Sequence, residues 1–186
     1  MTAPTDGNDH TEHSDHPDLT GVAGVMRAEW RAEQEAATAD AAAQWRHGRR
    51  LADWLCERMH AGDRIAVMVA AQPFDGLVEE VGDDLLALRG AFGRVEIQVC
   101  AGVPISFELV EHATQGGTRA TSRRGFRDAL VARDAQAGVR VGTLQQPDGI
   151  DGTLRVSRDF VTIMSRSGTE TLVPIAQVAW VKAARA

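Results

Sequence analysis

The sequence has few of the residues that build disulfide-rich, zinc-binding or membrane proteins. Among 186 residues there are two cysteines, Cys56 and Cys100, and neither belongs to a CxxC pair. This excludes a disulfide framework and a zinc knuckle, so we expect both to be small buried hydrophobic residues. No apolar run approaches the roughly 20 residues that span a bilayer, and the chain opens with acidic and polar residues, unlike a secretory signal. We expect a cytoplasmic protein without a membrane segment.

Positive charge is also scarce. The net charge is -6, and residues 1–20 contribute -5 of it, because they hold five acidic residues and no Lys or Arg. This segment has almost nothing apolar and is expected to be a disordered acidic tail. It carries three histidines at three-residue spacing that could ligate a transition metal, although such tracts are usually solvated and bind metal weakly: His10, His13 and His16.

Catalytic signatures are missing from the sequence. There is no GxSxG motif, no P-loop and no GxGxxG that opens a helix. Asp75, Asp83 and Asp84 could suggest acid–base chemistry or a cation site. However, Asp75 stands in a DG pair, a common turn signal, and Asp84 recurs at one place in an internal repeat, so turn chemistry explains them. We therefore expect no enzyme, no cofactor and no metal site.

The sequence does contain a helical pattern followed by strand patterns. Residues 21–61 are rich in Ala, Glu and Arg, with Met26 and Trp30 four apart, which predicts one long helix or two helices broken near Gly48. Strand patterns fill residues 62–111 and 139–186. Between them, residues 112–138 are expected to form a basic linker with one short helix.

The two strand-rich segments repeat each other. "FDGLVEEVGDDLLAL", residues 74–88, matches "IDGTLRVSRDFVTI", residues 150–163, so that Asp84 corresponds to Asp159. Each unit reads as five short strands, too few for a sandwich but suited to a small closed barrel. The predicted fold class is α+β, mainly β, with two tandem five-stranded barrels forming one compact body.

This pattern resembles the Sm-like family of small β-barrels. The first motif of that family is similar to the two segments quoted above, and its second motif is similar to "TLVPIAQVAWVK", residues 171–182. The resemblance covers residues 64–109 and 139–184 and implies the barrel fold. The RNA-site residues of the family are not carried over, because Leu85 follows the first motif Asp, only Phe160 could stack a base, and Lys182 lies at the wrong place.

Arginines gather in the linker. The segment 119–140 carries about +4, and its arginines could grip phosphates or an acidic partner, because guanidinium groups pair bidentately with either. The other interpretation is a solvated linker helix that contacts the acidic barrel faces. A smaller patch near residue 49 has the same two interpretations. The candidate binding residues of both patches are Arg119, Arg123, Arg124, Arg127, Arg133, Arg49 and Arg50.

Trp30 lies in a helical stretch too polar to bury much of itself. A helix with one or two aromatic anchors suits a partner groove or a second subunit, although a helix that folds back is equally consistent. We therefore expect a non-enzymatic interaction or scaffold protein of regulatory type, which binds a protein partner or itself through the helical segment and the barrel surfaces. The alternative is a nucleic-acid-binding regulator that uses the arginine-rich linker on RNA or DNA.

Overall fold

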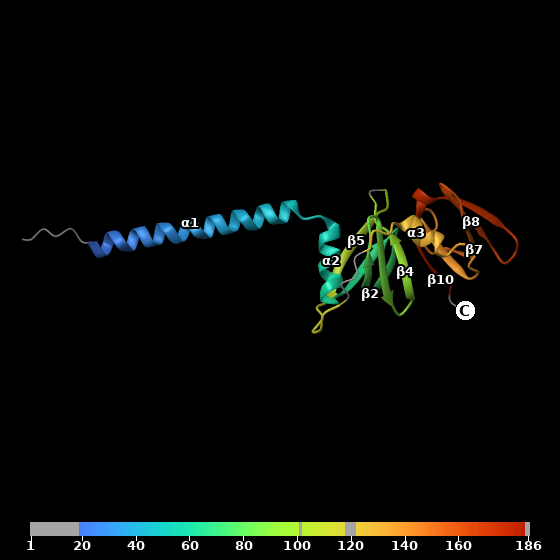
Figure 1. Ribbon diagram of the computed structural model, residues 1–186, viewed down its shortest axis with the longest axis horizontal. Helices are drawn as coiled ribbons and strands as arrows, with labels where there is room; N and C mark the ends of the chain where they lie inside the picture. Colours follow the sequence, from blue (N-terminus) through green and yellow to red (C-terminus); the bar gives the residue numbers. More distant parts are fainter. Residues whose placement is uncertain (1–18, 101, 118–121, 185–186) are drawn as a thin grey trace, which may run out of the picture. The chain divides into compact units, whose positions relative to one another are not determined.

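Helices fill most of residues 19–61, and strands fill most of the described residues that follow (Figure 1). The computed structural model describes residues 19–100, 102–117 and 122–184. Residues 1–18 of the expected acidic tail lie outside these ranges, and so does Arg119. The chain divides into two units, residues 1–49 and residues 50–186.

The helical pattern of residues 21–61 corresponds to two helices, α1 (Leu19–Gly48) and α2 (Leu51–Ala61). The break follows Gly48, and α2 then begins with a local cap, since the Asp53 carboxylate accepts the Arg50 backbone N–H at 2.9 Å. Gly62 ends α2 in the left-handed region at φ 79°, where its N–H donates to the carbonyls of Arg58 and Met59. The first unit therefore contains α1, and α2 belongs to the second.

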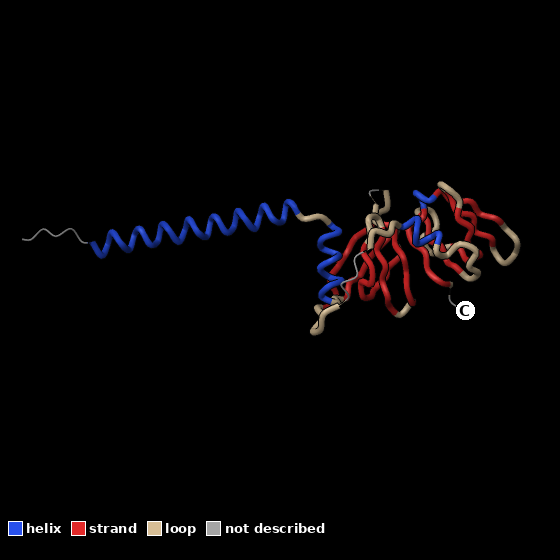
Figure 2. Tube along the Cα trace, viewed as in Figure 1, coloured by secondary structure: helices blue, strands red, loops and turns tan. Residues whose placement is uncertain are grey.

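The described residues of the second unit form ten strands and, besides α2, the helix α3 (Phe126–Val131). Figure 2 shows the strands in red and the connecting loops in tan. The strands are β1 (Arg64–Val69), β2 (Gln72–Val81), β3 (Leu85–Gly90), β4 (Gly93–Gln98), β5 (Ile105–Glu111), β6 (Val139–Thr143), β7 (Ile150–Val156), β8 (Phe160–Met164), β9 (Glu170–Pro174) and β10 (Val178–Ala183). A 3-10 turn at Ile175–Gln177 precedes β10. The expected class, α+β and mainly β, is confirmed.

The strands form one antiparallel sheet in the order β5-β1-β2-β3-β4-β10-β6-β7-β8-β9. Both halves follow the same path, with the fifth strand of each repeat placed beside the first. The halves join where β10 pairs with β4, with Trp180 opposite Ile97. The expected pair of closed barrels is not what the structure shows, because β4 satisfies its second edge with a strand of the other repeat and the sheet remains open at β5 and β9.

The two repeats also share their cores. Trp180 in β10 is 1% exposed and packs edge-on against Phe74 of the first repeat, with ring centroids 5.2 Å apart. Gly142 leaves space for the indole, since a Cβ at that position would lie 2.1 Å from it. In the opposite direction, Leu85 of the first repeat packs with Phe126 in the core of the second. No helix of the described residues is long and apolar enough to cross a membrane.

Candidate interaction surfaces

The arginines of the linker are gathered around α3, where most of them contact other parts of the chain. Arg133 is largely buried and pairs with buried Glu96 of β4 through Nε at 2.7 Å and Nη2 at 2.6 Å. Arg124 lies 3.6 Å from Glu80 and donates to the Asp128 carbonyl. These two guanidinium groups hold the α3 segment to the first repeat, so they are not directed at an external phosphate.

Arg127 is exposed but also contacts the chain. Its Nε donates to the carbonyl of Arg158 at 3.3 Å, and its Nη2 donates to the carbonyl of Ser157 at 3.4 Å. Arg123 is exposed as well. Of the described arginines predicted to bind a partner through the linker, these two are exposed, whereas Arg124 and Arg133 are partly buried.

The other candidates are divided between the two units. Arg49 belongs to the first unit, and its guanidinium carbon lies 4.8 Å from the ring of Trp45. Arg50 is the exposed N-cap of α2 in the second unit. Trp30 is 64% exposed and Trp45 is 59% exposed on α1. The structure thus brings Arg124, Arg127 and Arg133 together around α3, while Trp30 and Arg49 belong to the other unit.

The two DG aspartates are not turn residues, which corrects the sequence interpretation. Asp75 lies within β2 and Asp151 within β7, and each carboxylate accepts two hydrogen bonds from an arginine on the preceding strand. The partners are Arg64 and Arg140, whose Nε atoms both lie 2.6 Å from Oδ1. These hydrogen bonds lower the pKa of both carboxyl groups, so the carboxylates stay charged and are poor proton donors.

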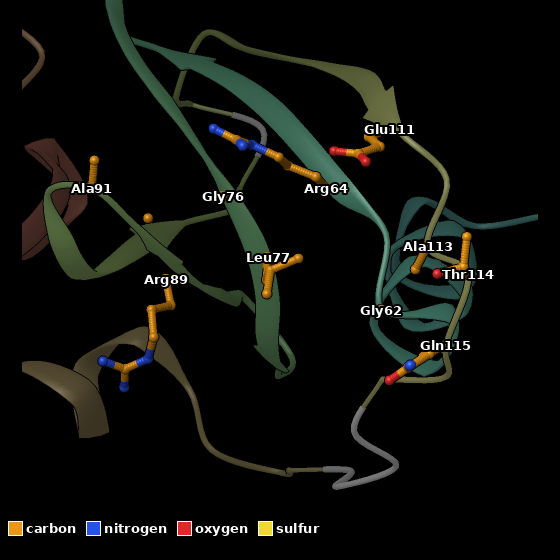
Figure 3. Close-up of a pocket in the computed structure, with 11 residues that line it drawn as sticks. Gly62, Arg64, Gly76, Leu77, Arg89, Ala91, Glu111, Ala113, Thr114 and Gln115 are labelled. Carbon is orange, nitrogen blue, oxygen red and sulfur yellow. The ribbon is translucent and has the colours of Figure 1, made fainter.

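A polar depression of about 640 Å³ lies beside the first of these pairs. Arg64, Glu111 and Gln115 line it, and Figure 3 shows the side chains of Arg64 and Arg89 pointing in different directions. Arg64 is bound to Asp75, and Arg89 donates to Glu79. Because each arginine already has a carboxylate partner, the depression has no convergent set of charges for a ligand.

A second hollow is apolar and was missed by the sequence reasoning. It is a groove of about 360 Å³ at the start of α2, between that helix and the turn from β2 to β3. The exposed fraction of Leu51 at its rim is 42%. The apolar lining consists of Leu51, Ala52, Leu55, Val81, Leu85, Val99, Cys100 and Ile105. The repeat seen in the sequence could not reveal it, because residues 51–61 lie outside the two matching segments.

The open sheet ends are protected against strand addition. β9 is five residues long and ends at Pro174, and β5 carries Glu108 and Glu111. Proline, charge and short length are the usual ways in which proteins blunt an edge strand. Leu172 on β9 is nevertheless 61% exposed. The edges are therefore weaker candidates for docking than the groove.

In the described ranges, no group of three or more His, Cys, Asp or Glu side chains is placed to hold a metal ion. Cys56 and Cys100 are both half-buried free thiols, and burial is the main cause that raises the pKa of Cys56. Comparison of the chain with protein-family models, curated proteins and solved structures found no match.

Proposed function

We propose that the chain is a non-enzymatic scaffold protein of regulatory type, which binds a protein partner through α1 and the surface of the sheet unit. The supporting observation is the exposure of Met26, Trp30 and Trp45 on a helix that forms a unit of its own. Large apolar side chains gathered on one element are typical of an interface.

The arrangement of these side chains along α1 suits another protein. Met26, Trp30, Ala37 and Ala41 are spaced by four, seven and four residues, which places them on one face of a helix. Thirty residues of helix extend about 45 Å at 1.5 Å per residue. A lone helix cannot bury its own apolar stripe, and most helical stability in proteins comes from packing such a stripe. A partner groove or helix would supply that packing.

The alternative, a nucleic-acid-binding regulator, has less support. Phosphate binding needs several available positive charges, because each neutralised phosphate adds to affinity. Arg124 and Arg133 are instead paired with Glu80 and Glu96. Of the linker arginines that the structure describes, this leaves Arg123 and Arg127 at the surface of an acidic protein. We therefore favour a protein partner.

The relation to the Sm-like family is also a proposal, together with the tandem five-stranded barrel arrangement that it implies. The repeated strand path supports it, since the fifth strand lies beside the first in both halves.

The test is affinity capture from host-cell lysate with the full chain and with the double variant Trp30→Ala, Trp45→Ala. We expect one partner to be retained by the wild-type chain and reduced at least about tenfold by the variant, because interface tryptophans typically cost 2 kcal/mol or more when truncated. Glu35→Ala, on the opposite face of α1, is the control. Equal capture by all three chains would refute the proposal, and labelled RNA and duplex DNA at two salt concentrations would test the alternative.

A further inference from the structure

The helices α2 and α3 begin in the same way, which fixes a residue-by-residue correspondence between the repeats. The N–H of Arg50 donates to Asp53, and the N–H of Gly125 donates to Asp128, both at 2.9 Å. Aligning these caps places Leu51 opposite Phe126 and Ala52 opposite Arg127.

The turns beside these helices also correspond. The N–H of Gly82 donates to the carbonyl of Leu85 at 2.8 Å, and the N–H of Ser157 donates to the carbonyl of Phe160 at 2.9 Å. Gly82 and Asp83 therefore occupy the places of Ser157 and Arg158. In both repeats the first turn of the helix lies beside this strand-to-strand turn.

In the second repeat an arginine links the helix to the turn. The Arg127 side chain extends from α3 to the carbonyls of Ser157 and Arg158. Arginine is suited to this position because its aliphatic stem covers apolar surface while the guanidinium reaches polar atoms. In the first repeat Ala52 is too short to do so, and the apolar groove remains open there.

The groove in the first repeat keeps the features that receive an arginine in the second. Its floor is apolar, with Leu55 and Ile105 among its side chains, and its rim holds the backbone of Gly82 and Asp83 at the places of the two acceptor carbonyls. Asp83 is also exposed, whereas the second repeat has the cation Arg158 at that position. The negative charge favours a cationic occupant and disfavours an acidic one.

We propose that this groove binds an arginine side chain of a partner protein, whose guanidinium donates to the carbonyls of Gly82 and Asp83 while a neighbouring aliphatic residue packs on Leu51. The inference rests on the proposed protein-binding function and names the chemistry of one contact. Arginine is favoured over lysine because its planar group presents several donors at once and is more weakly hydrated than an ammonium group.

The probe is the tripeptide acetyl-Leu-Arg-Leu-amide, titrated into the 15N-labelled full chain, with Leu-Lys-Leu, Leu-Glu-Leu and Leu-Leu-Leu as comparisons. We expect saturable shifts of the amide signals of Gly82, Asp83 and Cys100. The lysine peptide should bind at least about fivefold more weakly, since it cannot serve two carbonyls with one planar group. Equal shifts from the arginine and leucine peptides would show a nonspecific apolar groove and overturn the proposal.

The decisive variant is Ala52→Arg, which supplies the missing side chain within the chain itself. It should abolish the shifts caused by the arginine peptide while the circular dichroism spectrum stays unchanged. Asp83→Asn should weaken binding of the arginine peptide severalfold. This second variant tests the proposal even if Ala52→Arg does not fold. The matched control, Arg127→Ala, should keep the shifts at Gly82 and add new ones at Ser157. Undiminished binding by both Ala52→Arg and Asp83→Asn would overturn the proposal.

These outcomes are separable from those of the proposed function. If peptide binding fails while Trp30 and Trp45 remain necessary for partner capture, the arginine groove is wrong and the scaffold proposal stands. If partner capture does not need the tryptophans, while the arginine peptide binds and Ala52→Arg abolishes that binding, the role of α1 is wrong and the arginine groove stands.

Discussion

Replacing Trp180 by alanine should destabilise both repeats at once. The indole belongs to β10 of the second repeat but is buried beside Phe74 in the core of the first, and Lys182 lies 5.4 Å from its ring. Truncating a buried aromatic residue to alanine typically costs about 3–5 kcal/mol. An aromatic pair adds about 0.5–1.5 kcal/mol beyond its buried area. We therefore expect a loss of about 4 kcal/mol in the free energy of unfolding.

The assay is urea denaturation of the full chain followed by circular dichroism, because the substitution removes a fluorophore. A loss of about 4 kcal/mol is a large part of the 5–15 kcal/mol typical of a domain, so the midpoint should fall clearly. Trp45→Ala, at an exposed position on α1, is the control and should change the midpoint of the sheet unit little. A loss below about 1 kcal/mol for Trp180→Ala would refute the shared core, since surface substitutions alone reach about 0.5 kcal/mol.

Two further predictions concern charged pairs. Arg133→Met should cost about 3 kcal/mol of unfolding free energy, because buried Glu96 loses one of its two arginine partners and keeps Arg94. The control Arg123→Met, at an exposed position, should cost little. Equal urea midpoints for the two variants would contradict this prediction. For the second pair, the folded pKa of Asp151 lies below its unfolded value, so the stabilisation is present above the unfolded pKa and is lost as pH falls through the folded one. Arg140→Leu should raise the pKa of Asp151, measured by carboxyl NMR titration, and an unchanged pKa would contradict the pairing.

The repeat in the sequence anticipated much of the sheet. Apolar alternation and the recurring Asp84 and Asp159 indicated five strands in each half, and the structure has ten. The pattern could not show which edges meet, because alternation describes the faces of a strand and not its neighbour. The pairing of β10 with β4 in one open sheet could therefore not be predicted from the sequence.

The charged residues were harder to interpret from the sequence. The linker arginines looked like one patch, but Arg133 is paired with Glu96, which lies 37 positions away. Local charge counting cannot detect such a partner. Likewise, the DG pairs suggested turns, whereas Asp75 and Asp151 lie within strands and accept hydrogen bonds from arginines on the preceding strands. The repeat seen in the sequence does not include Ala52, whose correspondence to Arg127 follows from the matching helix caps in the structure.

The pairing of β4 with β10 has a consequence for the integrity of the chain. A backbone cut between Glu111 and Ser122 would separate the repeats covalently but would leave the Ile97–Trp180 pairing and the Trp180–Phe74 contact in place. The two fragments should therefore remain associated in solution and refold only in each other's presence. Neither repeat should fold by itself, because each contributes a side chain that completes the hydrophobic core of the other.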